Sequence, residues 1–172
     1  MRKQILMCVE TNKRANTDYV YITCVIDHFY ESTREITRKP IYLETKTKYR
    51  DRKKLSEINQ YKREYHGGET EVIYFIDMDE CATKPEDKKL LEDIKAFCFE
   101  NGYDLVLFNK DVEDVFWGQQ VADKEKIQKA GQFRSKRKIA DIQIDVLSTT
   151  PNSRHQSNIL SILDKYWTRK AI

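Results

Sequence analysis

The chain has 172 residues, of which 40% are hydrophobic and 34% are charged, and its net charge is +3. This length and apolar fraction exclude a disordered chain and are typical of one globular domain. A net charge this small says little about nucleic-acid binding, so evidence for such binding has to come from local clusters of charge.

No apolar run approaches the roughly 20 residues that a membrane-spanning helix needs. The N-terminal segment also lacks the apolar stretch of a signal peptide, because Glu10 and Lys13 interrupt it. The four cysteines form no C-x-x-C pair, so we expect reduced core thiols and no zinc site. These features predict a cytoplasmic protein without a membrane partner.

Strands and helices alternate from the start of the chain. Residues 4–9 are continuously apolar, as in a strand that is buried on both faces, and a polar loop follows at 10–16. Residues 17–31 fit either a helix or a strand, and we favour a helix because a parallel sheet needs a crossover here. A short strand is predicted at 39–45, with Pro40 at its start.

The same alternation continues through the middle of the chain. Residues 51–65 carry apolar side chains at helical spacing, and a strand is predicted at 71–77. The next helix begins at Pro85 and ends at Gly102, and a strand follows at 103–108. The βαβαβαβ pattern predicts an α/β fold with a mostly parallel central sheet flanked by helices.

The last third of the chain is less regular. We predict a short helix at 112–121, one further strand at 141–147 and a terminal helix at 155–168. The domain prediction is a single domain over residues 1–172, with its core at about 4–120 and a variable C-terminal part at 121–172.

Acidic side chains follow three of the predicted strands. Glu10 follows the first strand, Asp77 and Asp79 follow the third, and Glu113 lies after the fourth. Parallel strands bring their carboxyl ends to one edge of the sheet, which is where open α/β sheets bind ligands. We expect Asp77 and Asp79 to share one face of their strand, where a divalent cation would relieve their repulsion. Such oxygen ligands indicate Mg²⁺ and phosphate chemistry, and a solvated turn is an equally good interpretation of the D-x-D pair.

The order of these motifs resembles the Toprim domain, nearest to the small RloB-like and OLD-like phage-defence proteins. The resemblance covers residues 4 to about 120 and is carried by residues 5–10, 17–19, 72–79 and 109–117. It implies a Toprim-like, Rossmann-like fold and an Mg²⁺-dependent (or Mn²⁺-dependent) nuclease. Glu10 would be the general acid or base or a metal ligand, Asp77 and Asp79 would be catalytic and bind Mg²⁺, and Glu113 would be an auxiliary metal-binding acid.

One position departs from the Toprim pattern. Toprim proteins usually have glycine after the first glutamate, whereas this chain has Thr11. A Cβ at this position restricts how closely a phosphate can approach the backbone. This departure bears on catalytic activity and not on the fold.

Positive side chains cluster in two stretches, at residues 46–54 and 124–138. Such stretches suit contact with a phosphate backbone, and a solvated helix face is an equally good interpretation. Lys13 and Arg14 could pair with Glu10 or hold a phosphate. The candidate nucleic-acid-binding residues are Lys13, Arg14, Lys129, Arg134, Lys136, Arg137 and Lys138.

Three further side chains have an ordinary structural interpretation. We interpret His155 as a residue at a helix start, with phosphate contact or proton transfer as the alternative. Phe116 and Trp117 could stack on a base, but burial against the sheet is favoured for large aromatic side chains.

The leading functional hypothesis is phosphodiester cleavage of DNA or RNA, in phage defence or nucleic-acid processing. The first alternative is a non-catalytic Toprim-like module for nucleic-acid binding or assembly. The second is an unrelated doubly wound domain, such as a receiver-like fold. The sequence leaves open whether the substrate is DNA, RNA or a nucleotide, whether a partner ATPase is required and whether the chain forms a homo-oligomer.

Overall fold

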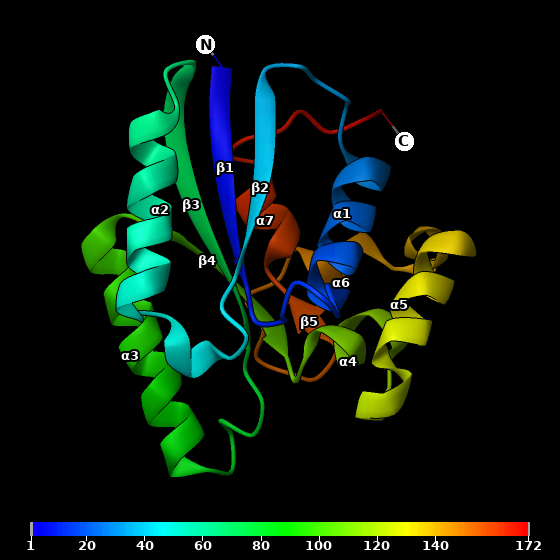
Figure 1. The fold of residues 1–172 in the computed structure, drawn as a ribbon. Coiled ribbons are helices and arrows are strands. Elements are labelled where there is room, and N and C mark those ends of the chain that lie inside the picture. The colour runs from blue at the N-terminus through cyan, green and yellow to red at the C-terminus, as the bar shows by residue number, and fades with distance from the viewer. Residues whose placement is uncertain (1, 172) are drawn as a thin grey trace.

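The computed structural model describes residues 2–171, in which five strands form one sheet between two layers of helices (Figure 1). The strands are β1 (Arg2–Val9), β2 (Ile36–Tyr42), β3 (Gly68–Asp77), β4 (Asp104–Asn109) and β5 (Gln156–Ser157). Their order in the sheet is β2-β1-β3-β4-β5, with β1 to β4 parallel and β5 antiparallel to β4. The predicted α/β class, a mostly parallel sheet flanked by helices, is confirmed.

Helices join the strands and complete the fold. The α-helices are α1 (Thr17–Phe29), α2 (Arg52–Glu64), α3 (Pro85–Asn101), α4 (Val112–Trp117), α5 (Lys126–Ser135), α6 (Ile144–Leu147) and α7 (Ile159–Leu163). Short 3₁₀ turns lie at η1 (Lys46–Lys48), η2 (Asp123–Glu125) and η3 (Lys138–Asp141). Figure 1 shows α2 and α3 on one side of the sheet and α1, α4 and α5 on the other. The preferred helix at 17–31 is therefore confirmed as α1.

The sheet has a core on each face. Successive side chains of a strand point to opposite faces, so Ile5 and Met7 of β1 pack with the α1 side while Leu6 and Cys8 pack with the α2 and α3 side. All four are fully buried. This two-sided burial explains why residues 4–9 are continuously apolar.

The C-terminal part of the chain belongs to the core on the α1 side. Phe133 of α5 and Ile159 and Leu160 of α7 are fully buried in the same cluster as Ile5 and Phe75 of the sheet. The α1 face of the sheet is thus covered by helices from both the beginning and the end of the chain.

Two predictions for the C-terminal part are wrong. Residues 141–147 form the end of η3 and then α6, where Leu147 is buried and Ile144 is 43% exposed, so the apparent alternation of Ile142, Ile144 and Val146 does not mark a buried strand face. The terminal helix predicted at 155–168 is limited to α7 (Ile159–Leu163), because residues 156–157 form β5 before it and the chain after it turns back and pairs with Tyr30 through Arg169.

Two predicted boundaries also differ from the structure. Pro40 lies within β2 and opposite Met7, and not at the start of the strand. Because β2 is at the edge of the sheet, the absence of a backbone N–H at Pro40 is tolerated there. The short helix predicted at 112–121 ends as α4 at Trp117, because Gly118 adopts a left-handed conformation with φ of 66°.

Candidate acidic site at the carboxyl edge of the sheet

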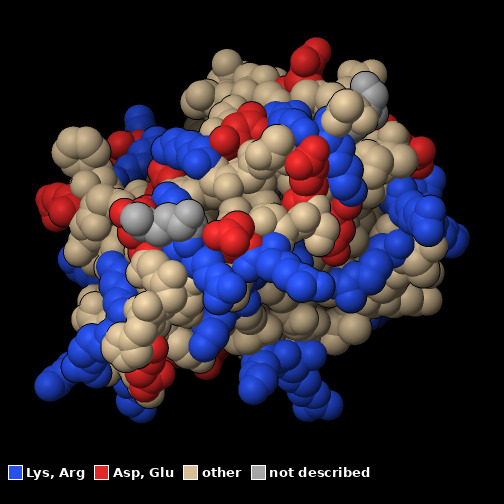
Figure 2. Space-filling view, turned by 90° about the horizontal axis from the view of Figure 1, so that it is seen from above, with Lys and Arg blue, Asp and Glu red and all other residues tan. Residues whose placement is uncertain are grey.

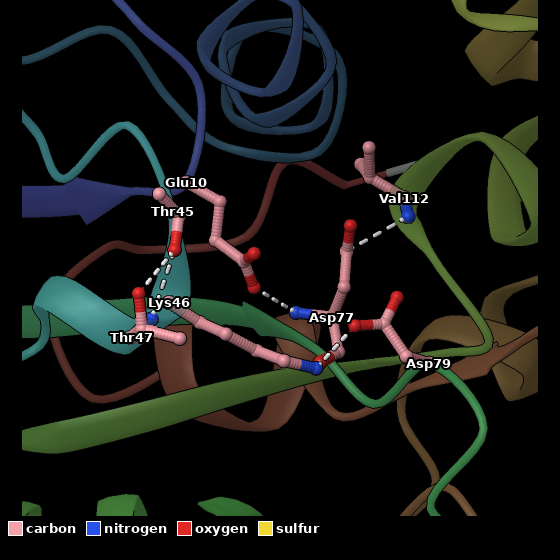
Figure 3. Close-up of polar contacts among 7 residues, drawn as sticks. All are labelled: Glu10, Thr45, Lys46, Thr47, Asp77, Asp79 and Val112. Carbon is pink, nitrogen blue, oxygen red and sulfur yellow. Dashed lines mark hydrogen bonds and ion pairs between the residues drawn. The ribbon is translucent and has the colours of Figure 1, made fainter. Parts of the chain in front are cut away.

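The strand order places Glu10 and Asp77 at the switch point of the sheet, where β1 and β3 lie side by side. Strands β1 and β3 are neighbours in the sheet, although their connections lead away to β2 and β4 on opposite sides. A crevice at such a switch point is the usual ligand site of open α/β sheets. Glu10 directly follows β1, Asp77 ends β3, and the Asp77 N–H donates a hydrogen bond of 2.7 Å to Glu10 Oε1 (Figure 3). The predicted convergence of these two acids is confirmed.

Asp77 and Asp79 do not share a strand face, contrary to the expectation. Strand β3 ends at Asp77, and a left-handed φ of 50° turns the chain at Asp79. Asp77 Oδ1 accepts a 3.0 Å hydrogen bond from the Val112 N–H at the start of α4. Asp79 instead points to Lys46 and forms an ion pair with it (Figure 3).

Lys46 is an unpredicted member of this site. Its side chain is 8% exposed, and its ammonium donates to the Asp79 carboxylate and, at 2.9 Å, to the Asp77 carbonyl oxygen. The side chain reaches the site because η1 follows β2 directly at the carboxyl edge, with Thr45 capping that turn by accepting from the Thr47 N–H.

Two further carboxylates are enclosed beside Asp77. Asp18 lies in the first turn of α1 and Glu113 lies on α4, and both side chains are buried. Neither carboxylate oxygen of Glu113 accepts a hydrogen bond from the described residues, although Lys126 Nζ lies 3.3 Å from Oε2. Asp18 accepts from its neighbour Thr17 at 3.3 Å. Asp18 and Lys126 were not predicted as site residues.

Burial and crowding raise the pKa values of these acids. Burial raises the pKa of Glu10 to about 8, against the lowering effects of the Asp77 N–H and Lys46. Burial raises the pKa of Glu113 to about 7 and that of Asp18 to about 6, with Lys126 acting in the opposite direction on both. Burial, followed by the charges of Glu10 and Asp18, raises the pKa of Asp77 well above its usual range. The site therefore holds protons or needs additional positive charge at neutral pH.

The two lysines supply part of that charge. Burial lowers the pKa of Lys46, but its hydrogen bond to Asp79 and the nearby carboxylates outweigh this effect and raise it overall. Lys126 behaves in the same way beside Glu113. Two ammonium groups thus face five carboxylates, namely Glu10, Asp18, Asp77, Asp79 and Glu113.

The donors fit Mg²⁺ in kind and in charge. They are hard carboxylate oxygens, their negative charge exceeds the charge of the neighbouring lysines, and Glu113 has oxygens without a hydrogen-bond donor among residues 2–171. Within that range, no three His, Cys, Asp or Glu side chains lie close enough together to form a ready metal centre. The five carboxylates are thus enclosed, but they are spread around the point where β1 and β3 meet.

Thr11 lies next to this cluster and is partly buried. Its hydroxyl oxygen is enclosed and has no hydrogen-bond partner among the described residues. The backbone N–H groups of Glu10 and Thr11 donate hydrogen bonds to Asp18, which connects the loop after β1 to the start of α1.

The candidate basic residues are spread over several elements. Lys13 and Arg14 are exposed in the loop that follows Glu10. Lys129 lies with its ammonium 4.8 Å from the ring centre of Trp117. Further from the acidic site, at the end of α5 and in η3, lie Arg134, Lys136, Arg137 and Lys138.

The remaining candidate side chains have structural roles. His155 precedes β5 and is not at a helix start, contrary to the prediction. Its Nδ1 lies 2.9 Å from Oδ2 of the buried Asp114, which also pairs with Arg154. Phe116 is buried, and the Trp117 Nε1–H donates a 2.9 Å hydrogen bond to the Tyr21 hydroxyl. All four cysteines are free thiols, of which Cys8 and Cys98 are buried as predicted and Cys24 and Cys81 are only partly buried.

Comparisons with protein-family models, with curated proteins and with solved structures found no match to this chain. Over residues 2–171, no helix combines the length and apolar character that crossing a bilayer requires.

Proposed function

We propose that the chain is a Toprim-like domain that uses Mg²⁺ or Mn²⁺ to cleave nucleic-acid phosphodiesters, in phage defence or nucleic-acid processing. The observation that carries the proposal is the meeting of Glu10 and Asp77 at the β1/β3 switch point, joined by a 2.7 Å hydrogen bond and surrounded by further enclosed acids. Scattered surface acids lack this convergence, and crowded carboxylates at a ligand-binding edge suit a divalent cation.

Each site residue then has a distinct role. Asp77 and Asp79 would hold the cation, with Glu113 as an auxiliary ligand. A bound divalent cation supplies charge that polarises a phosphoryl oxygen and stabilises a leaving oxygen. Glu10, with its pKa raised to about 8 by burial, would exchange a proton with the reacting groups near neutral pH. Lys13 and Arg14, exposed beside Glu10, would contact the phosphate backbone.

The test is cleavage of single-stranded and double-stranded DNA and RNA, with Mg²⁺, with Mn²⁺ and with a chelator. The Asp77→Asn variant keeps an oxygen that can accept from the Val112 N–H but loses the charge. We expect it to lower the cleavage rate by at least about a hundredfold.

The matched control is Glu100→Gln, which removes an exposed carboxylate near the end of α3. It should leave the rate unchanged. Equal cleavage by Asp77→Asn and the parent would contradict the assignment of Asp77 as a metal ligand, and so would cleavage that a chelator does not inhibit.

A second candidate is a non-catalytic nucleic-acid-binding or assembly module with the same fold. The observation that favours it is Lys46, whose ammonium already neutralises Asp79 and contacts the Asp77 carbonyl oxygen. Calorimetric titration with Mg²⁺ separates the candidates. Absence of binding at millimolar Mg²⁺, together with intact binding of nucleic acid, would favour the module.

A further inference from the structure

A pocket of about 320 Å³ lies on the flank of the molecule, between α1, the end of α5 and the C-terminal segment. Its lining residues are Cys24, Asp27, His28, Phe133, Arg134, Arg137, Ile139 and Lys170. Figure 2 views the molecule from the end at which the strands begin, where α1 and α5 also end, and shows Lys and Arg side chains gathered across that face.

Three cations in this pocket lack a carboxylate partner among residues 2–171. Arg134 donates to the Thr23 hydroxyl at 3.1 Å, and Lys170 Nζ donates to the Asp27 carbonyl oxygen at 2.6 Å. Arg137 is exposed, and no ion pair joins it to the described part of the chain. The one carboxylate in the lining, Asp27, pairs with Arg38 at 3.3 Å. The cations are therefore free to bind an anion.

The pocket also has a less polar wall. Cys24 and His28 of α1 are partly exposed and contribute to the lining, whereas Phe133 and Ile139 are buried in the core on the α1 side. The volume of about 320 Å³ exceeds what one phosphate group needs and reaches the lower end of the range for small-molecule sites. A ligand that fits this lining has an anionic head and a less polar body.

The pocket is separate from the acidic site. Lys126, which pairs with Glu113, and Arg134 lie eight positions apart along α5, which corresponds to roughly 12 Å of helix. Lys126 belongs to the acidic site and Arg134 to the pocket, so a substitution in one site removes no side chain of the other.

We propose that this pocket binds a nucleoside monophosphate. The guanidinium groups of Arg134 and Arg137 donate to the phosphate oxygens, Lys170 adds positive charge, and the nucleoside lies against the wall formed by Cys24 and His28. Planar guanidinium groups suit phosphate oxygens in both geometry and charge. This inference goes beyond the proposed cleavage function and does not depend on it.

Calorimetric titration of the intact chain with AMP, and separately with adenosine, tests the proposal. We expect AMP to bind and adenosine to bind at least about tenfold more weakly, because the phosphate provides the charged hydrogen bonds. Arg137→Gln and Arg134→Gln should each weaken AMP binding by about tenfold or more. The control Lys136→Gln removes an exposed charge at the end of α5 that is outside the pocket lining, and it should bind AMP as the parent does.

Arg137→Gln is the decisive variant, because the exposed Arg137 side chain makes no hydrogen bond or ion pair with residues 2–171, whereas Arg134 donates to Thr23. Asp77→Asn should leave AMP binding unchanged. The proposal is overturned if the parent does not bind AMP at millimolar concentration, if adenosine binds as tightly as AMP, or if Arg137→Gln binds as the parent does. Loss of AMP binding in Asp77→Asn would also overturn it, because the nucleotide would then bind at the acidic site.

Discussion

Oε1 of Glu10 accepts the backbone N–H of Asp77 at 2.7 Å, so a side chain after β1 satisfies the last peptide group of β3. This bond gives Glu10 a structural role beside its proposed chemical one. The two roles can be separated, because glutamine keeps the accepting oxygen and loses the charge, whereas alanine loses both.

Glu10→Gln is expected to be as stable as the parent or more stable, since it removes a carboxyl group whose ionised form is disfavoured by burial. Glu10→Ala should lower the free energy of unfolding by about 1 to 2 kcal/mol, because the Asp77 N–H loses its acceptor. Urea unfolding of the three proteins measures this difference. Both variants should lose cleavage activity, and equal stability of the two would show that the hydrogen bond contributes little.

The stability of the metal-free protein should fall as the pH rises from about 5 to 8. The folded-state pKa values of Asp18, Glu113 and Glu10 are raised to about 6, 7 and 8, so the folded state binds more protons than the unfolded state in this range. Their contribution to stability is complete below the unfolded pKa values and is lost as the pH passes through the folded ones. Thermal unfolding in a chelator measures the trend, and added Mg²⁺ should reduce it at pH 8. A flat profile would contradict these shifts.

Lys46→Gln should strengthen Mg²⁺ binding. The ammonium of Lys46 pairs with Asp79 and lies beside Asp77, so it opposes a cation bound by the same carboxylates. Removing one positive charge at this range should lower the dissociation constant by roughly three- to tenfold. Calorimetric titration provides the measurement, with Lys48→Gln, whose side chain pairs with Glu44, as the control from the same turn. Weaker binding by Lys46→Gln would mean that Lys46 supports the cation site.

Asp114→Ala should destabilise the fold by about 1 to 3 kcal/mol, because its buried carboxylate joins α4 to the segment before β5. It holds Arg154 at 2.5 Å and His155 at 2.9 Å. Urea unfolding measures the loss, and Glu100→Ala, which removes an exposed carboxylate, should leave the stability unchanged within about 0.5 kcal/mol.

Two glycine substitutions should have opposite effects. Gly68 has a φ of 157°, and a Cβ there would lie 1.8 Å from the Arg2 carbonyl oxygen. Gly68→Ala should therefore prevent the start of β3 from pairing with β1, at a cost of at least about 3 kcal/mol. Gly131→Ala, within α5 and with open space around the new Cβ, should stabilise by about 0.4 to 1 kcal/mol. Similar unfolding midpoints for the two variants would contradict this account.

The apolar pattern of the strands and the rule that parallel strands end at one edge of a sheet were enough to predict that Glu10 and Asp77 lie together. The continuous apolar run at 4–9 identifies a strand buried on both faces, and parallel strands bring their carboxyl ends together. Glu10 and Asp77 could thus be placed together although 67 positions separate them.

The missed site residues depend on packing that the sequence pattern does not contain. Lys46 meets Asp77 across 31 positions, and only because β2 lies beside β1 and η1 then turns toward β3. Aspartate is common in the first turn of a helix, so only burial distinguishes Asp18 as a residue of the site. The strand predicted at 141–147 failed for a related reason, since alternating apolar residues do not reveal which of them will be buried.

The interior position of Pro40 in β2 has a consequence for self-association. This outermost strand has one backbone donor fewer than its length would provide, and charged Arg38 and Lys39 precede the proline. At the opposite border, β5 offers only two residues. Both borders are thus poor templates for an incoming strand, so the sheet resists growth into larger β-assemblies.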